Sequence, residues 1–388
     1  MQTIFFDHIS GTPIHPEAKE VMIRYINEHY GNPVSQHRLG DDASEALETA
    51  REQVAGLINA KPQEIVFTSG GTESVNHAIK GVAMATYDKG KHIVTSNIEH
   101  QSVSKSLRML MRMGYRVTSV SVDKYGFIDP REVEKAIADD TVLVSIMHAN
   151  NEIGTLEPIA EIGKITRKRG IIFHTDAIAS VGVVPFDVDA MGVDLVSMAA
   201  NQFYGPSGVG ALYIRPKTRI LPLIEGGMQE NGQRAGTENM IGIVGMGKAA
   251  ELAKNEMDQR IKHLGKLRQA WMDKLKTVEA IEINGHPTEC LPHLVSFSVL
   301  YVEGESMILM LDEKGICAST RSACASGSLR ASHVLLATGC DYAAAQGTLI
   351  FSFGIMNTME ELDKAMEVFK DSVVFLRNMS PLYKKKTA

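Results

Sequence analysis

The residues that could carry chemistry stand in short polar clusters, each placed directly after an apolar run. The clusters are Ser69-Gly-Gly-Thr72, His100, Asn150-Asn151, Asp176 and Asn201-Gln202. Side chains of these types bind anions, hold a heterocycle or move protons near neutral pH. Their shared position after apolar runs predicts that they meet at one site.

The segment Thr68–Glu73 reads Thr-Ser-Gly-Gly-Thr-Glu, follows an apolar run and opens a helical stretch. Glycines let the backbone close on an anion, and the start of a helix supplies unpaired N–H groups. Gly71 and Thr72 are therefore candidates for holding a phosphate. A plain strand-to-helix turn fits the same sequence.

Asp176 and His100 are candidates for holding a heteroaromatic ring. A carboxylate at a strand end can keep a pyridine nitrogen protonated, and a histidine can stack on a ring and transfer protons. Each residue also has a simpler interpretation. Asp176 could be a helix N-cap, and His100 could be a polar surface residue.

Cys324 stands among small and polar residues between Ser319 and Ser328, a composition typical of an accessible loop. Arg321 would favour its thiolate, although a buried structural cysteine is an equally simple interpretation. The remaining cysteines form no Cys-x-x-Cys pair with it or with one another, which argues against a zinc site built by this chain alone. They are Cys290, Cys317 and Cys340.

Seven β-rich apolar runs alternate with helical stretches and predict the framework of the site. They lie at residues 65–68, 92–95, 116–122, 141–147, 170–175, 193–197 and 209–214. This pattern predicts an α/β fold with a mostly parallel seven-stranded sheet covered on both faces. Ligands of such sheets bind beyond the carboxyl ends of the strands.

A long amphipathic helix over about residues 241–278 should lead into a smaller α/β unit with strands near 282–284, 294–299, 316–319 and 349–353. We expect a large domain at 16–258 and a small domain formed by 1–15 with 259–388, which carries Cys324. Thr358 and Glu361 predict a capping box at the start of the last helix. The methionines at 109, 111 and 113 predict a core-facing helix surface.

Composition excludes several classes of partner. The chain has 388 residues and a formal net charge of −6, which argues against a nucleic-acid or anionic-membrane surface. No apolar stretch reaches the roughly 18–20 residues of a membrane span, and the first residues lack the basic start and apolar core of a signal peptide. We therefore expect a cytoplasmic protein.

Taken together, the motifs resemble those of cysteine desulfurases of the NifS/IscS type, over nearly the whole chain. They are Thr68-Ser-Gly-Gly-Thr-Glu-Ser, Asn97-Ile-Glu-His, His148-Ala-Asn-Asn-Glu-Ile-Gly-Thr, His174-Thr-Asp-Ala, Gly226-Gly-Met-Gln-Glu-Asn-Gly-Gln-Arg-Ala-Gly-Thr-Glu-Asn and Ser322-Ala-Cys, in family order. The resemblance implies a fold-type I pyridoxal phosphate (PLP) homodimer. Such proteins take sulfur from cysteine as a persulfide and pass it to iron–sulfur scaffolds or other acceptors.

The resemblance also implies roles for residues around the cofactor. Gly71 and Thr72 would cradle the phosphate, and His100 would stack on the ring. Asp176 would contact the pyridine nitrogen, and Asn151 would lie near the ring hydroxyl and the substrate.

Two further roles follow from the same resemblance. Thr237 would reach the phosphate bound by the neighbouring subunit, so a complete site would need a dimer. Cys324 would be the persulfide cysteine.

The chain departs from the family pattern at positions that belong to the same site. The Schiff-base lysine position holds Gln202, and the neighbouring histidine position holds Asn201. A phosphate-binding serine is replaced by Ala199, a ring-contacting glutamine by Ala179, and the arginine that binds the substrate carboxylate by Ile350. Because an amide forms no imine, any PLP would be held non-covalently.

Three interpretations follow, and they differ on whether the chain is an enzyme. The first is a protein of sulfur mobilisation and iron–sulfur assembly that handles sulfur through Cys324, or ligates with it a cluster shared with a scaffold protein. Its PLP-dependent desulfuration of cysteine would be impaired or absent. The second is a slow desulfurase using non-covalent PLP, and the third is a non-catalytic partner or small-molecule-binding homologue.

Overall fold

The computed structural model describes residues 3–320, 331–381 and 383. Cys324, the predicted persulfide cysteine, lies outside the described residues. The environment of Cys324 therefore stays a prediction.

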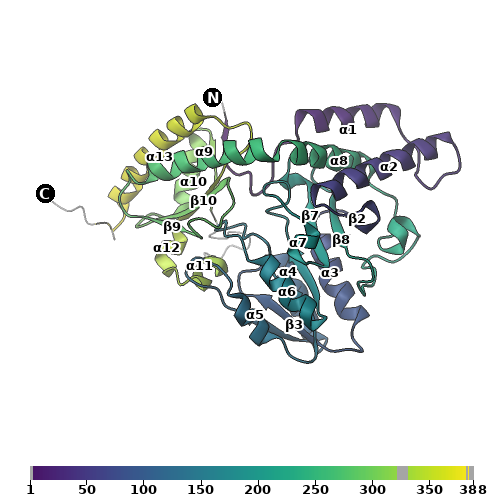
Figure 1. Cartoon of the computed structure of the whole chain (residues 1–388). Helices are drawn as coiled ribbons and strands as arrows, with labels where there is room; N and C mark the ends of the chain where they lie inside the picture. Colours follow the sequence, from purple (N-terminus) through teal and green to yellow (C-terminus); the bar gives the residue numbers. More distant parts are fainter. Residues whose placement is uncertain (1–2, 321–330, 382, 384–388) are drawn as a thin grey trace.

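A seven-stranded sheet forms the centre of the larger part of the molecule (Figure 1). Its strand order is β2-β8-β7-β6-β5-β3-β4, and only β8 runs antiparallel to its neighbours. The predicted mostly parallel seven-stranded sheet is confirmed. The strands are β2 (Ile65–Thr68), β3 (His92–Ser96), β4 (Arg116–Val120), β5 (Thr141–Ser145), β6 (Ile172–Asp176), β7 (Leu195–Ala199) and β8 (Gly210–Ile214).

Both faces of this sheet are buried. Adjacent residues of one strand enter different apolar clusters: Leu143 packs with α3 (Gly71–Ala85) and α4 (Gln101–Arg112), whereas Val144 packs on the opposite side. That side is covered by helices whose apolar residues share one cluster with the strands. They include α1 (Pro16–Glu28), α2 (Arg38–Leu57), α5 (Pro130–Ala136), α6 (Ile159–Arg169), α7 (Val188–Met191) and α8 (Met240–Asn255).

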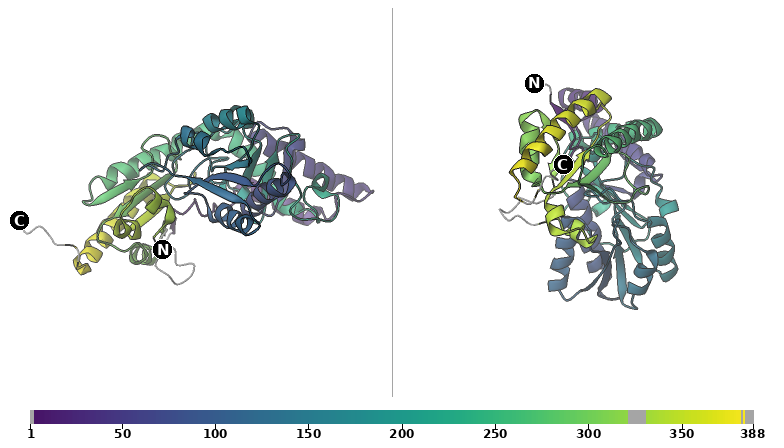
Figure 2. Two further views of the ribbon diagram at one scale, coloured as in Figure 1. Left: turned by 90° about the horizontal axis from the view of Figure 1, so that it is seen from below. Right: turned by 90° about the vertical axis from the view of Figure 1, so that its left-hand side faces the viewer.

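A second, four-stranded antiparallel sheet has the order β12-β13-β10-β9. Its strands are β9 (Ile281–Asn284), β10 (Leu294–Val299), β12 (Ser319–Thr320) and β13 (Thr348–Ser352). Helices α9 (Met257–Leu275), α10 (Gly304–Glu313) and α13 (Met359–Met379) lie beside it (Figures 1 and 2). Its core centres on Trp271, which is fully buried and stacks on Phe351 with ring centroids 4.6 Å apart.

The N-terminal segment joins this second unit. Strand β1 (Ile4–Phe5) pairs in parallel with β11 (Ile316–Cys317). The short helices α11 (His333–Ala337) and α12 (Tyr342–Gln346) precede β13. The exact division into domains at 16–258, and at 1–15 with 259–388, stays a prediction.

Three local expectations are wrong. The helix expected over 241–278 is two helices, because Glu256 between α8 and α9 has non-helical angles of φ −103° and ψ 4°. The strand expected at 316–319 divides into β11 and β12, which pair with different partners. Met109, Met111 and Met113 are exposed, because residues two apart on a helix do not share the buried face.

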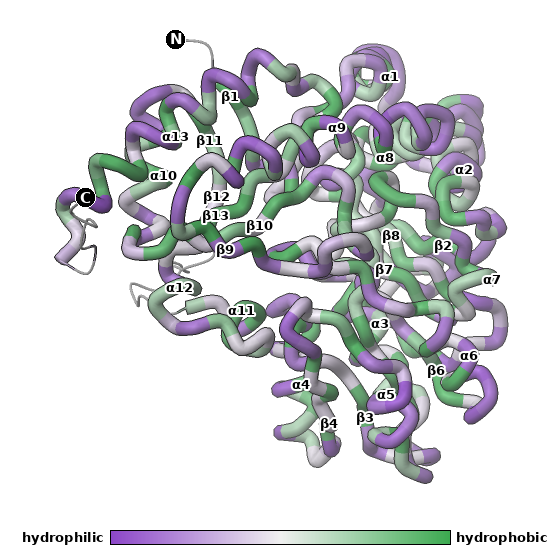
Figure 3. The backbone as a smooth tube through the Cα atoms, turned by 60° about the vertical axis from the view of Figure 1, so that its left-hand side comes forward, coloured by the Kyte–Doolittle hydropathy of each residue, from purple (hydrophilic) through white to green (hydrophobic). Residues whose placement is uncertain are grey.

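Hydropathy follows this architecture. In Figure 3 strand β10 is largely hydrophobic, whereas helix α5 is largely hydrophilic. Among the described residues, no helix is both long and apolar enough to cross a membrane.

Candidate functional site

A cavity of about 390 Å³ lies beyond the carboxyl ends of β2, β3, β5, β6 and β7. The structure brings to it most of the residues that the sequence singles out, namely Gly71, Thr72, His100, Asn151, Asp176, Asn201 and Gln202. The rest of its lining is apolar apart from Ser10, and consists of Ile9, Met147, Ala149, Ile178, Ala179 and Ala199. Strand ends from different parts of the chain therefore build one site.

The start of α3 forms one side of the cavity. Gly70, the residue before the helix, has φ +148°, a conformation that L side chains rarely adopt. A Cβ on Gly71 would lie 2.2 Å from Cδ1 of Ile178, so glycine lets the helix start close to that side chain. Glu73 in the first turn accepts a 2.9 Å hydrogen bond from the Ser69 N–H and pairs with Arg234 at 3.0 Å.

Asp176 ends β6 and is 5% exposed. Its Oδ1 accepts a 3.1 Å hydrogen bond from the N–H of Ile178, and the next residues form a turn rather than a helix. The N-cap interpretation is therefore wrong. Burial raises the carboxyl pKa from its usual 3.8 to about 6, so a cationic or N–H partner would stabilise its ionised form.

His100 is exposed, lines the cavity and caps α4. Its Nδ1 accepts a 3.1 Å hydrogen bond from the Ser102 N–H, which places the proton of the neutral ring on Nε2. The cap thus fixes the tautomer of an imidazole that borders the cavity.

Asn150 and Asn151 differ in their surroundings. Asn150 is fully buried; its side chain donates to the Ile98 carbonyl and accepts from the Glu152 and Ile153 N–H groups. These contacts hold the loop after β5. Asn151 lines the cavity instead.

Glu99 is a candidate that reasoning from the sequence missed. It is 2% exposed, and its Oε1 accepts hydrogen bonds from Ser96 Oγ at 2.7 Å and from the Met147 N–H at 3.0 Å. Burial raises its pKa to about 8. The motif Asn97-Ile-Glu-His was the available signal, since the glutamate directly precedes a cavity residue.

Gln202 ends a short 3-10 turn, Ala200–Gln202, that follows β7. Its side-chain Nε2 donates a 3.1 Å hydrogen bond to the backbone carbonyl of Ile9. The backbone carbonyl of Asn201 accepts from the N–H of Thr12 at 2.8 Å. The N-terminal segment is thereby fixed along the edge of the cavity.

Ile350 is fully buried in β13 and does not line the cavity. It belongs to an apolar cluster that includes the lining residues Ile9, Ala149 and Ala179. This wall of the cavity is therefore continuous with a hydrophobic core.

Thr237 lies apart from this cavity. It borders a separate cavity of about 90 Å³, which Ser69 and Arg234 also line. Its proposed contact with a neighbouring subunit's phosphate stays a prediction.

The segment that follows 321–330 is anchored beside the candidate site. Ser332 hydrogen-bonds to the carboxylate of Glu152, and His333 Nε2 donates to the backbone carbonyl of Glu99 at 3.1 Å. Glu152 and Glu99 directly adjoin the lining residues Asn151 and His100. Ser332 and His333 therefore lie at the rim of the cavity.

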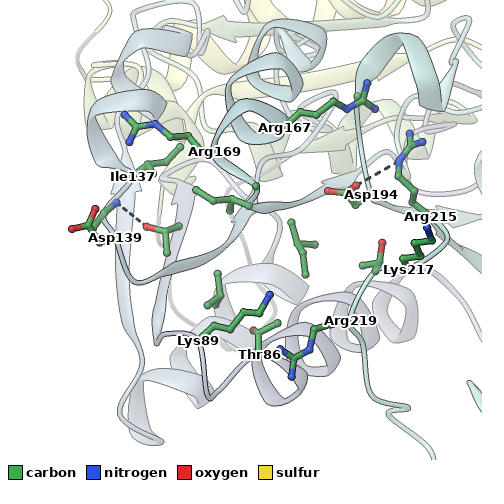
Figure 4. Close-up of a pocket in the computed structure, with 18 of the residues that line it drawn as sticks. Thr86, Lys89, Ile137, Asp139, Arg167, Arg169, Asp194, Arg215, Lys217 and Arg219 are labelled. Atoms are coloured by element: carbon green, nitrogen blue, oxygen red, sulfur yellow. Dashed lines mark hydrogen bonds and ion pairs between the residues drawn. The ribbon is translucent and has the colours of Figure 1, made fainter.

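A larger cavity of about 640 Å³ lies at the opposite, amino-terminal edge of the parallel strands (Figure 4). In Figure 4 Arg167 and Arg169 extend away from its centre. Both stand in the last turn of α6, where cations offset the helix dipole. Arg215 pairs with Asp189 at 2.8 Å, so the charge of Arg215 already has a partner within the protein.

Among residues 3–320 and 331–381, no group of three or more His, Cys, Asp or Glu side chains could hold a metal ion. The site resembles a cofactor or small-molecule cavity instead. Its parts are a helix start, a buried carboxylate at a strand end and an imidazole.

The sequence pattern of the Aminotransferase class-V family matches residues 4–365, and the chain belongs to this family. Among curated proteins it is similar to "Cysteine desulfurase IscS" of Dictyoglomus turgidum, with 49% identity over 97% of this chain and 96% of the relative. It is 48% identical to "Cysteine desulfurase IscS" of Methanosarcina thermophila over 99% of this chain and 95% of that protein.

A solved structure described as "NIFS-LIKE PROTEIN" shares the fold, with a TM-score of 0.91 and 37% identity. The match covers 96% of this chain and 100% of that one. The resemblance expected from the motifs is confirmed, and so is the fold-type I PLP-transferase architecture.

The lining residues fit a PLP ring in part. A buried carboxylate (Asp176) and an imidazole of defined tautomer (His100) suit a protonated pyridine ring. Among the described lining residues there is no amine to which the aldehyde could be joined. The residues thus fit a non-covalently held ring and do not fit a covalent attachment.

Proposed function

We propose that this protein mobilises sulfur for iron–sulfur cluster assembly or another acceptor through Cys324, and that its PLP-dependent desulfuration of cysteine is impaired or absent. The relatives named cysteine desulfurase IscS support the sulfur-handling part. The observation that carries the impairment is Gln202, an amide that borders the cavity and donates to the Ile9 carbonyl. It occupies the proposed position of the Schiff-base lysine.

Two proposed losses affect the same reaction. When bound, PLP supplies an electron sink for bond breaking at the substrate. Removing a general acid–base group costs about 10²–10⁴ in rate. A hydrogen-bonded charge pair contributes roughly 1.5–3 kcal/mol, and Ile350 forms none at the proposed position of the arginine that would bind the substrate carboxylate.

Cys324 would accept sulfur from a persulfide. Its thiolate attacks the outer sulfur of the donor, a new S–S bond forms, the donor's S–S bond breaks, and the donor leaves as a thiolate. The contacts of Ser332 and His333 hold the chain that follows residues 321–330 beside the cavity, which supports this proposal. Alternatively, the same thiolate would ligate iron in a cluster shared with a scaffold protein.

Labelling with a ³⁵S-persulfide donor tests this proposal. We expect label that dithiothreitol releases on the wild-type protein and on Cys317→Ala, a control cysteine in β11, but not on Cys324→Ala. Label of equal amount on Cys324→Ala would overturn the sulfur-relay proposal. An anaerobic visible spectrum of the protein with its scaffold tests cluster ligation. The Cys324→Ala variant should lack the broad iron–sulfur absorption that the wild-type protein shows.

The buried carboxylate of Asp176 favours a second candidate, a slow cysteine desulfurase that uses non-covalent PLP. This function requires alanine release from cysteine when PLP is supplied, and an inactive Asp176→Ala variant. Release that is equal in wild type and variant would eliminate this candidate.

We also propose a cytoplasmic homodimer. Thr237 borders a different cavity from His100 and Asp176, which supports a contribution to the neighbouring subunit's site. Sedimentation of the full chain tests the dimer, and a monomer at micromolar concentration would contradict it.

A further inference from the structure

The lining of the candidate cavity is polar in one part and apolar in another. Gly71 and Thr72 bring the start of α3 to the cavity. Ile9, Ala149 and Ala179 form a wall of buried apolar side chains. A ligand that fills the cavity therefore meets both polar backbone and hydrocarbon.

The apolar wall continues into a hydrophobic cluster. Ile9, Ala149 and Ala179 pack in one cluster with Leu291, Leu294 and Ile350, and Ile350 is fully buried. Among the described residues that line the cavity, none is Lys or Arg. A carboxylate placed against this wall would lose its water and gain no cation in exchange.

Two polar residues of the lining, Gln202 and Asp176, offer hydrogen-bond acceptors. The Nε2 of Gln202 already donates to the Ile9 carbonyl, so the Oε1 of Gln202 is the atom that can accept from a ligand. Asp176 supplies a carboxylate whose Oδ1 accepts from the Ile178 N–H. This arrangement favours a ligand that carries N–H groups.

We propose that the cavity binds a phosphorylated pyridine whose amine substituent carries no carboxylate, and so selects simple primary amines over α-amino acids. The inference rests on the proposed function for the identity of the ring. It goes beyond that function by naming the substituent class that the apolar wall accepts.

Two stable reduced adducts test the inference because they differ only in one carboxylate. They are N-(5′-phosphopyridoxyl)ethylamine and N-(5′-phosphopyridoxyl)-L-alanine, titrated calorimetrically into the full-length protein. We expect the ethylamine adduct to bind at least about tenfold more tightly, which is about 1.4 kcal/mol. Equal or tighter binding of the alanine adduct would overturn the proposal, and so would a failure of both adducts to bind at millimolar concentration.

A cation placed in the wall should reverse the preference. Ile350→Arg is the direct variant, with its fold checked by circular dichroism. Ala179→Arg provides a second variant that does not require a charge inside β13, because Ala179 lines the cavity. If neither variant that folds strengthens binding of the alanine adduct, the apolar wall is not the selecting element.

The ³⁵S label on Cys324 is measured on the same protein samples. Loss of the adduct preference with intact labelling would overturn only this inference. Loss of labelling with an intact preference would overturn only the sulfur relay.

Discussion

The side-chain amide of Gln202 donates a 3.1 Å hydrogen bond to the backbone carbonyl of Ile9, which joins the loop after β7 to the N-terminal segment. The N–H of Ile9 donates at 2.8 Å to Ser352 Oγ at the end of β13. Ile9 therefore connects the loop that borders the cavity with the second sheet. Gln202 has a structural partner as well as a position in the candidate site.

Replacing Gln202 with lysine should supply the amine that the cavity lacks. We expect Gln202→Lys to retain PLP through dialysis after borohydride reduction, with the cofactor linked to position 202 in a peptide map. A lysine ammonium can also donate to the Ile9 carbonyl, so the fold should be preserved.

The matched control is Gln202→Met, which keeps the side-chain length and has no amine. It should carry no reduced cofactor, like the wild-type protein. If reduction fixes PLP on the wild-type protein at any lysine in the cavity, the proposed loss of covalent attachment is incorrect.

Glu99 should make stability depend on pH. Burial raises its folded pKa from 4.5 to about 8, so the folded protein holds a proton that the unfolded chain has released between these values. Stability from this group is fully present below about pH 4.5 and is lost as pH rises through about 8. Glu99→Gln has no carboxyl to ionise. Its free energy of unfolding should therefore rise relative to that of the wild type by about 1.4 kcal/mol per pH unit between pH 4.5 and about 8.

Urea unfolding followed by tryptophan fluorescence at a series of pH values measures this difference. The control is Glu313→Gln at the exposed end of α10, whose curve should run parallel to that of the wild type. A Glu99→Gln curve that also runs parallel would show that Glu99 ionises normally in the folded protein.

Local sequence patterns predicted the framework well. The seven runs form strands because residues such as Leu143 and Val144 are both apolar and can be buried on opposite faces. The capping box of Thr358 and Glu361 forms as expected, because it depends only on residues within one helical turn. The convergence of polar clusters at one cavity follows from the parallel order of the strands.

Contacts between distant segments could not be predicted in this way. The hydrogen bond of Gln202 to Ile9 joins residues 193 positions apart. The buried carboxylate of Glu99 accepts a hydrogen bond from the N–H of Met147, which follows strand β5. The break at Glu256 depends on backbone angles that a hydropathy pattern does not specify. The exposure of Met111, in contrast, follows from its spacing on the helix and could have been predicted.

Breaking the buried ion pair between Arg51 and Glu230 should strongly destabilise the fold. Arg51 Nη1 lies 2.7 Å from Glu230 Oε2, and each residue is 7% exposed. Arg51→Met leaves an unpaired buried carboxylate, so we expect a loss of about 3–5 kcal/mol in the free energy of unfolding. Urea unfolding checks this value.

A double variant and an exposed pair provide the controls. Arg51→Met combined with Glu230→Met should recover much of the loss, because no charge is left unpaired. Arg131→Met breaks the exposed pair with Asp129 and should leave the midpoint unchanged. If Arg51→Met has the same urea midpoint as the wild type, water compensates the Glu230 carboxylate in place of the arginine.

His333 should position the Cys324 segment for sulfur transfer. Its Nε2 donates at 3.1 Å to the carbonyl of Glu99, directly before the cavity residue His100. His333→Ala removes this anchor, so the rate of ³⁵S transfer to Cys324 should fall by up to about tenfold, the effect of roughly one hydrogen bond. The thermal midpoint should stay near that of the wild type, because the side chain lies at the surface of α11.

His333→Gln, which can still donate to the Glu99 carbonyl, should recover much of the rate. Equal rates in all three proteins would show that the rim contact does not position the cysteine.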